Sequence, residues 1–182
     1  MENPTGGNEL ITVDILSKAG VQAGMKVADL GCGNLGYFAI PAAKMVGKDG
    51  ISYAVDILKS VLEAVEGRAK MQGLSNLKTV WSNLEMLGAT AIEEASLDIA
   101  FLINMIFQSD KDDIVVKEAC RLVKSGGKVA VVDWLKIATP FGPPALDRSN
   151  PEDIKRFAAA AGLKLEEEFS AGPYHYGLLF SK

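Results

Sequence analysis

The chain has 182 residues, enough for one domain with a sizeable core, and 48% hydrophobic with 23% charged residues is ordinary for a soluble globular protein. A net charge of −4 provides no basic surface, so a nucleic-acid partner is disfavoured. The longest apolar run is too short to span a membrane, no secretory leader opens the chain, and two distant cysteines suit a reducing compartment. We therefore expect a cytoplasmic protein, and one histidine without a paired-cysteine motif predicts no metal site.

Helix-like and strand-like segments alternate along the chain. Residues 1–7 are polar and Gly-rich and predict a flexible arm before a single domain over 8–182. Apolar positions three and four residues apart predict helices, several of which end at a glycine. These helices are predicted over residues 10–19, 37–46, 58–69, 109–123 and 149–161. A loop with a short helix is expected over 84–96, and a long loop over 135–148.

Two of these helices carry start signals. Ser109 with Asp110 is predicted to cap the fourth helix. For the fifth, Ser149 and Glu152 have the spacing of a capping box, with Pro151 in the first turn. Both starts are therefore expected at the serine.

Short apolar runs predict the strands. They cover residues 27–30, 51–55, 77–81, 97–103, 128–134, 163–169 and 175–180. The last two are joined only by residues 170–173, too few for the crossover that parallel strands need, so they are predicted to form an antiparallel hairpin. The strand–helix alternation before this hairpin predicts a three-layer α/β, Rossmann-like fold on a mostly parallel sheet.

The first predicted strand runs into the stretch VADLGCGNLG, residues 27–36, which contains a G-x-G-x-x-G pattern. A strand, a glycine-rich turn and a helix in this order present free backbone N–H groups to a ligand. Gly31 and Gly33 let a ligand approach the main chain, and Asp56 after the second strand is placed to accept hydrogen bonds from a ribose diol. NAD and S-adenosylmethionine (SAM) both contain such a ribose, so these features leave the two ligands open.

Asp29 favours SAM over NAD. It ends a strand predicted to be buried on both faces, where an unpaired carboxylate is costly. Its charge would repel the pyrophosphate of NAD and attract the sulfonium and ammonium groups of SAM. The alternative is that Asp29 only caps the loop.

The glycine-rich stretch resembles the first motif of class I SAM-dependent methyltransferases, and the similarity covers nearly the whole chain. Residues 132–134 together with 142–144 are similar to small members of the ubiquinone/menaquinone-biosynthesis-methyltransferase-like subgroup. Other segments resemble later motifs of the family, namely residues 53–56, 82–85, 97–101 and 122–127. The resemblance implies a seven-stranded sheet of order 3-2-1-4-5-7-6 with an antiparallel last strand.

The resemblance also implies which residues hold SAM and its product, S-adenosylhomocysteine. They are Asp29, Gly31, Cys32, Gly33, Asp56, Ile57, Asn83, Leu84 and Asn104. The thiol of Cys32 is itself expected to pack in a tight turn rather than to act as a nucleophile.

Three residues are candidates for assisting the methyl transfer. His175 is suited by its chemistry, although it lies between two tyrosines and could equally belong to an aromatic cluster. Asp133 follows strand five, and Gln108 stands where subgroup members often have a histidine. Trp134 and Phe141 are expected near the mouth of the pocket.

The leading interpretation is methyl transfer from SAM to a small-molecule acceptor. The alternatives are an RNA or protein methyltransferase, and a SAM-binding module without catalysis. The last is suggested by Gln108, by a short N-terminal segment, and by Leu35, which adds a residue before Gly36 and leaves the contacts from Asn34 onward open.

Overall fold

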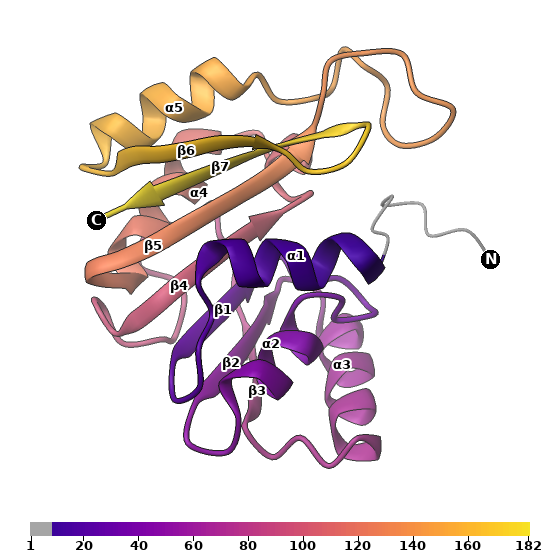
Figure 1. The fold of residues 1–182 in the computed structure, drawn as a ribbon, viewed down its shortest axis with the longest axis vertical. Helices are drawn as coiled ribbons and strands as arrows, with labels where there is room; N and C mark the ends of the chain where they lie inside the picture. Colours follow the sequence, from indigo (N-terminus) through magenta and orange to yellow (C-terminus); the bar gives the residue numbers. More distant parts are fainter. Residues whose placement is uncertain (1–8) are drawn as a thin grey trace.

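The computed structural model describes residues 9–182, with side chains from Thr12 onward, and these residues form one seven-stranded sheet (Figure 1). Its order is β3-β2-β1-β4-β5-β7-β6, as the family resemblance implied. The strands are β1 (Lys26–Leu30), β2 (Ile51–Asp56), β3 (Leu77–Trp81), β4 (Leu97–Ile103), β5 (Val123–Trp134), β6 (Lys164–Ser170) and β7 (His175–Ser181). The first five strands are parallel, whereas β7 runs antiparallel to both of its neighbours. The predicted arm over 1–7 lies outside the described residues.

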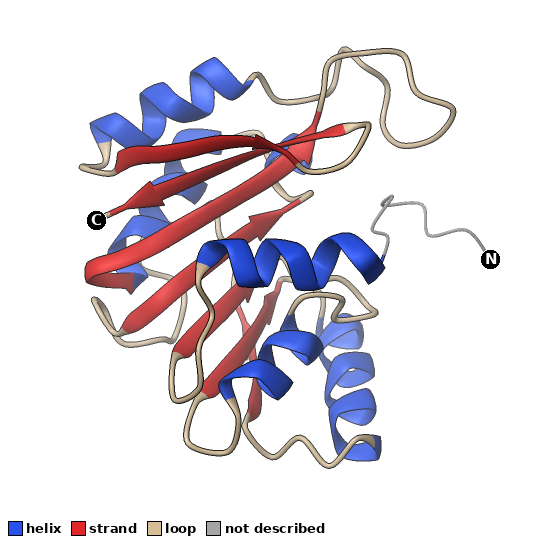
Figure 2. Ribbon diagram, in the orientation of Figure 1, coloured by secondary structure: helices blue, strands red, loops and turns tan. Residues whose placement is uncertain are grey.

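Helices cover both faces of the sheet, so the fold has three layers (Figure 2). One face carries α1 (Glu9–Ala19), α2 (Ala39–Val46) and α3 (Lys59–Met71); the other carries the 3-10 turn η1 (Ile106–Gln108), α4 (Asp112–Leu122) and α5 (Pro151–Ala160). The alternation of strand side chains fixes this division. In β5, for example, Val129 and Val131 pack toward α4 and α5, while Ala130 and Val132 pack toward α1 and α2.

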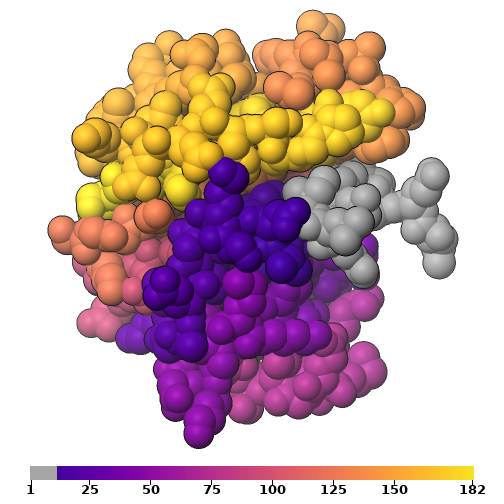
Figure 3. Space-filling model, viewed as in Figure 1, coloured from indigo at the N-terminus to yellow at the C-terminus, as the bar shows by residue number. Residues whose placement is uncertain are grey.

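The first helix packs against the C-terminal strands of the sheet. In Figure 3 the indigo surface of α1 lies against the yellow C-terminal strands. Lys18 forms an ion pair with Glu167 of β6, and its ammonium lies 4.8 Å from the centroid of the Phe169 ring. Ile15 and Leu16 are buried in the same layer, so α1 is held by apolar packing as well as by charge.

Two predicted helix starts were wrong. In α5 the capping residue is Asn150, whose side chain accepts from the N–H of Glu152, and Pro151 is the first helical residue. The hydroxyl of Ser149 is instead engaged with the hydroxyl of Tyr176, 2.8 Å away. Helix α4 begins three residues after Ser109, whose hydroxyl accepts from the N–H of Lys111. In each case the serine makes another contact instead of capping the helix.

Strand β5 is longer than predicted because its glycines do not interrupt it. It begins at Val123, directly after α4, and continues through Gly126 and Gly127. The N–H of Gly126 donates to the carbonyl of Lys182, 2.8 Å away. A side chain on Gly127 would lie 2.7 Å from the carbonyl oxygen of Asp98. Glycine therefore permits close strand pairing here rather than ending an element.

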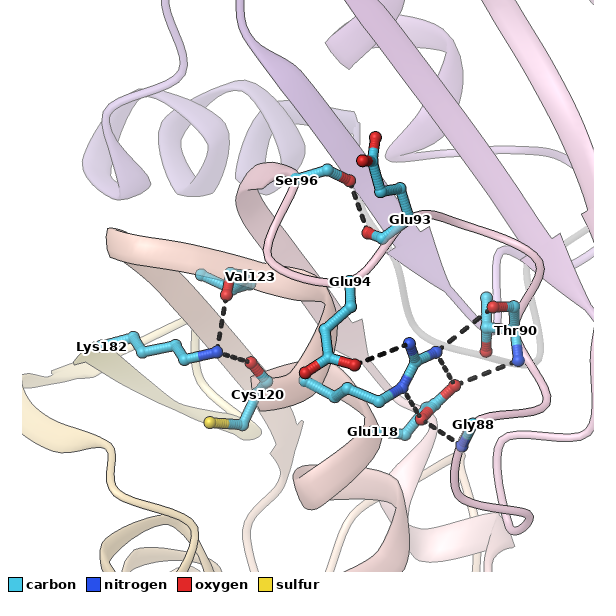
Figure 4. A network of polar contacts seen from close by, with 10 residues as sticks. Gly88, Thr90, Glu93, Glu94, Ser96, Glu118, Cys120, Val123 and Lys182 are labelled. Carbon is cyan, nitrogen blue, oxygen red and sulfur yellow. Dashed lines mark hydrogen bonds and ion pairs between the residues drawn. The ribbon is translucent and has the colours of Figure 1, made fainter.

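The helix expected within residues 84–96 is absent, and contacts from α4 hold this segment as a loop (Figure 4). The buried carboxylate of Glu118 accepts from the N–H groups of Gly88 and Thr90, at 2.8 and 3.1 Å. It also pairs with Arg121, whose guanidinium donates to the carbonyl of Thr90. These bonds replace the main-chain bonds that a helix would have made.

Candidate functional site

The loop after β1 is fastened to β2 and leaves part of its main chain accessible. The N–H groups of Gly31 and Cys32 both donate to the carbonyl of Val55, at 2.8 and 3.0 Å. Gly31 has φ +89°, and a side chain there would lie 2.6 Å from Cγ of Met105. Gly33 has φ +60°, and a Cβ at this position would have no heavy atom within 4 Å. A ligand can therefore approach the main chain closely at Gly33.

Asp56 lies beside this open glycine. One oxygen of its carboxylate accepts from the N–H of Gly33 at 3.2 Å, and the other accepts from the N–H of Leu58 at 3.0 Å. The side chain is half-buried at the end of β2. Each carboxylate oxygen can accept more than one hydrogen bond, so Asp56 retains capacity for two ligand hydroxyls.

Asp29 is buried, with 3% of its surface exposed, and it contacts the start of the next helix. Its Oδ2 accepts from the N–H of Ala39, the first residue of α2, at 3.1 Å. Burial raises the pKa of Asp29 to about 7, with a smaller contribution in the same direction from Asp56, while the Ala39 hydrogen bond opposes the rise. The carboxylate therefore holds the start of α2, and it is also a titratable group beside the glycine turn.

Cys32 packs in the core between β2 and the helices α2 and α3. Its partners in that cluster are Ala39, Ala54, Leu62 and Val65. Burial, and secondarily the carboxylates of Asp29 and Asp56, raise the pKa of the Cys32 thiol far above its usual range. The thiol stays protonated and is unsuited to nucleophilic attack.

The segments after β2 and β3 form a more exposed rim. Ile57 is exposed, and its carbonyl accepts from the indole N–H of Trp81 at 2.7 Å. The Asn83 side chain accepts from the N–H of Glu85 at 2.9 Å, while Leu84 is buried in the core and leaves only its main chain for a ligand. The sequence analysis did not name Trp81 as a residue of this rim. Trp81 is 52% exposed, and its position as an aromatic residue at the end of the third strand was the available signal.

Asn104 and Gln108 are tied together after β4. Asn104 has the left-handed φ of +51°, and its N–H donates to the carbonyl of Val132 at 2.8 Å. The side-chain amide of Gln108 donates to the carbonyl of Asn104 at 2.7 Å. Gln108 thus stabilises the turn that presents Asn104 at the sheet edge.

Asp133, a candidate base, is fully buried and bonded to the main chain through both oxygens. Oδ1 accepts from the N–H of Trp134 at 2.7 Å, and Oδ2 accepts from the N–H of Phe107 at 3.2 Å. Burial raises the pKa of Asp133 to about 7, since it outweighs these hydrogen bonds, and the nearby Asp112 adds to the rise. These contacts hold η1 against β5.

His175, the other candidate base, is also buried, and its ring centroid lies 4.1 Å from that of Trp134. Burial, and then the charge of Arg148, lower the pKa of His175 to about 4. The imidazole is therefore neutral at neutral pH and available to accept a proton or a hydrogen bond.

The sheet brings these residues to one edge. Strands β1, β2, β4 and β5 are parallel, so their carboxyl ends meet there, and the antiparallel β7 adds its first residue beside Trp134. Ligands of open α/β sheets bind at this edge, where the strand order reverses between β1 and β4. Within residues 9–182, no group of three His, Cys, Asp or Glu side chains could hold a metal ion, and no helix is long and apolar enough to cross a bilayer.

The sheet order, the antiparallel β7 and the glycine turn after β1 define a class I methyltransferase of Rossmann-like fold. A family model described as a methyltransferase domain matches residues 21–160, and the chain belongs to this family. It is 34% identical over 128 residues to the ubiquinone/menaquinone biosynthesis C-methyltransferase UbiE of Laribacter hongkongensis. The aligned residues make up 70% of this chain and 50% of the relative. The UbiE protein of Chromobacterium violaceum is 33% identical over 129 residues, with the same coverage. The chain spans about half the length of these curated relatives.

Solved structures share the fold. A SAM-dependent methyltransferase from Aquifex aeolicus superposes with a TM-score of 0.85 at 21% identity, covering 99% of this chain and 98% of the other. A geranyl diphosphate methyltransferase, solved in complex with SAM, has a TM-score of 0.77 at 13% identity, with 95% and 84% covered. At these identities the similarity concerns the fold alone.

Proposed function

We propose that this chain transfers a methyl group from SAM to a small-molecule acceptor. The observation that carries the proposal is the pairing of Asp56 with Gly33, an acid beside a main-chain position open to a ligand. An adenosine diol fits a carboxylate at the end of β2, and the neighbouring glycine leaves room for the rest of the ligand. Membership of the methyltransferase-domain family supports the same reading.

The proposed cofactor site follows the edge of the sheet from β2 to β4. Asp56 accepts from the ribose hydroxyls, and Ile57 with the main chain at Asn83 and Leu84 flanks the adenine. At the other end, Asp29 attracts the ammonium group, near the main chain at Gly31, Cys32 and Gly33. Asn104 closes the site after β4.

The chemistry asked of the protein is mainly alignment. SAM supplies a methyl group that its sulfonium has already activated. The residues at the sheet edge orient the cofactor and an acceptor in line, and such positioning is worth up to ~7–11 kcal/mol when the geometry is good. A base, where the acceptor needs one, contributes ~10²–10⁴-fold in rate. His175, neutral at neutral pH, fits that role better than Asp133, whose oxygens are already bonded to the main chain.

Calorimetry with SAM, S-adenosylhomocysteine and NAD tests the ligand. We expect micromolar dissociation constants for the first two, about −8 kcal/mol, and no competition from NAD. Asp56→Ala should weaken SAM binding by about 1.5–3 kcal/mol, because hydrogen bonds to a charged acceptor are lost. The melting temperature of the free protein should change little. NAD binding as tight as SAM binding would overturn the assignment.

Methyl transfer itself needs a second assay. Labelled SAM is incubated with a panel of phenols, quinols, thiols and amines, and with RNA and a protein mixture, and the labelled product is identified. A small-molecule product supports the proposal, while labelled RNA or protein supports the alternative. SAM binding without any product in this panel would favour a binding module.

Both cysteines are free thiols, which supports the cytoplasm as the proposed location.

A further inference from the structure

Two ring nitrogens at the edge of the sheet are buried without a hydrogen-bond partner. Trp134 is 0% exposed and His175 is 6% exposed. Among the described side chains, Nε1 of Trp134 and Nε2 of His175 have no partner. Buried polar atoms are nearly always satisfied, so two orphans side by side need an explanation.

The two rings form one surface. Trp134 ends β5 and His175 begins β7, and the two residues are paired directly across these strands. Their ring centroids are 4.1 Å apart. This surface lies beyond β4 from Asp29 and Asp56 along the same edge: Trp134 is two to three strands away and His175 three to four. Strands are about 4.8 Å apart, so Trp134 lies roughly 10–15 Å and His175 roughly 14–19 Å from these two acids, and a second, small ligand fits between them and the wall.

The loop over residues 135–148 covers the indole of Trp134. A side chain on Gly142 would lie 2.6 Å from the indole ring, so only glycine allows the loop to approach this closely. The Phe141 ring meets the indole edge-on at 6.0 Å, and the Arg148 guanidinium lies 5.1 Å from its centroid. The indole is therefore enclosed by the loop rather than by the core of the domain.

Arg148 fastens this loop from inside. Its guanidinium donates to the carbonyls of Leu135, Ile137 and Pro143, and the loop's own residues line an open surface hollow of about 330 Å³. No helix or strand forms within the loop, and the side chains of Ile137, Phe141 and Leu146 point at least partly to solvent. One buried side chain thus supplies most of the loop's polar anchoring, which suits a segment that opens and closes as a unit.

We propose that Trp134 and His175 form the polar wall of the methyl-acceptor pocket, and that the loop over 135–148 is its lid, covering the wall when no acceptor is present. The proposal rests on the proposed function for the existence of an acceptor. It adds the chemistry of that acceptor: a molecule carrying a hydroxyl group.

The hydrogen-bonding pattern of the wall selects this group. The indole N–H of Trp134 is a donor only, whereas a neutral imidazole with its proton on Nδ1 accepts at Nε2. A hydroxyl oxygen accepts from the indole N–H while its own proton is donated to His175, so one group satisfies both orphans.

The chain is well suited to a direct test, because it has two tryptophans and one histidine. Nitrogen-15 spectra of the full chain contain two indole signals, which Trp81→Phe assigns, and one imidazole. With S-adenosylhomocysteine present, phenol is titrated as the probe and toluene as the matched molecule without a hydroxyl. We expect phenol to move the Trp134 indole proton downfield and to shift the His175 ring nitrogens. Toluene should leave the indole proton in place.

Two variants separate a binding role from a structural one. Trp134→Phe keeps an aromatic ring but removes the donor, so phenol should bind about tenfold more weakly while S-adenosylhomocysteine binds unchanged. His175→Phe should give a similar loss, and it provides the test if Trp134→Phe does not fold. Phenol that moves neither ring, or toluene that moves both equally, would overturn the proposal. Absence of S-adenosylhomocysteine binding would instead count against the proposed function.

Discussion

Asp29 combines two roles at one carboxyl group. It accepts from the N–H of Ala39 at the start of α2, and burial raises its pKa to about 7. A cationic ligand nearby would replace part of the lost hydration and favour the ionised form. Under the proposed function, we therefore expect Asp29 to lose its proton when SAM binds.

Removing this charge should affect the amino-acid end of the ligand only. Asp29→Asn keeps the size and some hydrogen bonding of the side chain, so we expect SAM to bind more weakly by about 1–3 kcal/mol. Adenosine, which lacks the charged tail, should bind the variant almost as well as the wild type. Calorimetry with both ligands measures the difference, and an equal loss for both would show that Asp29 only shapes the loop.

The same experiment has a pH dependence of known sign. Below the pKa of about 7 the Asp29 carboxyl must first lose its proton, so SAM affinity should fall as the pH is lowered from 8 to 6. Above that pKa the affinity should level off. Asp29→Asn should bind SAM with little change over this range, apart from titration of the ligand itself. Adenosine, which lacks the charged tail, is the control and should show no such dependence with either protein.

At the scale of elements, Glu118 of α4 organises the loop that follows β3. Burial opposes ionisation of Glu118, but hydrogen bonds from Arg121, Gly88 and Thr90 outweigh it and lower its pKa to about 2. Glu118→Ala would leave the guanidinium and two N–H groups without their acceptor. We expect a loss of about 3–5 kcal/mol in the free energy of unfolding, measured by urea titration.

An exposed pair on the same helix is the matched control. Asp113 and Lys117 are 2.9 Å apart but each is about 40% exposed, and solvent screens surface pairs of this kind. Asp113→Ala should therefore change stability little. Equal losses for the two variants would mean that Glu118 does not hold the loop.

The elements that sequence reasoning predicted well are those fixed by local pattern. The antiparallel pairing of β6 with β7 was confirmed, because a four-residue connection allows only one direction. The strand order, which the family resemblance implied, was confirmed as well. The errors lie where a distant residue decides the local structure. Glu118, some thirty residues away, replaces the helix expected within 84–96, and Tyr176 engages the hydroxyl of Ser149 that was expected to cap α5.

The residues of the candidate site differ in the same way: some are placed by local sequence pattern and others by tertiary packing. Asp56 and Gly33 could be placed from the sequence because a strand end and a glycine turn determine where they lie. The surroundings of His175 could not, since its burial depends on Trp134 and on a loop whose shape is set by Arg148. Side chains fixed by tertiary packing leave no periodic signal in the sequence.

At the scale of the whole molecule, buried titratable groups give stability an unusual dependence on pH. Burial raises the pKa of Asp29 and of Asp133 from 3.8 to about 7, and lowers that of His175 from 6.5 to about 4. A carboxyl with a raised pKa stabilises the fold fully below pH 3.8, and this stabilisation is lost as the pH rises through 7. The histidine acts in the opposite sense, since its stabilisation is complete above pH 6.5 and is lost as the pH falls through 4.

Over this range the stability lost at the two carboxyls as the pH rises exceeds the stability gained at the imidazole. The free protein should therefore be most stable in mildly acid solution. Urea unfolding should show a free energy that declines by about 3 kcal/mol between about pH 5 and pH 8. Saturating SAM should reduce the decline, because its ammonium group stabilises the ionised Asp29, whereas the share of Asp133 should persist. Asp29→Asn should likewise flatten the profile of the free protein. A stability that rises from pH 5 to pH 8 in the wild type would show that these two acids are ionised at little cost, and Asp29 would then be no proton-linked contact for SAM.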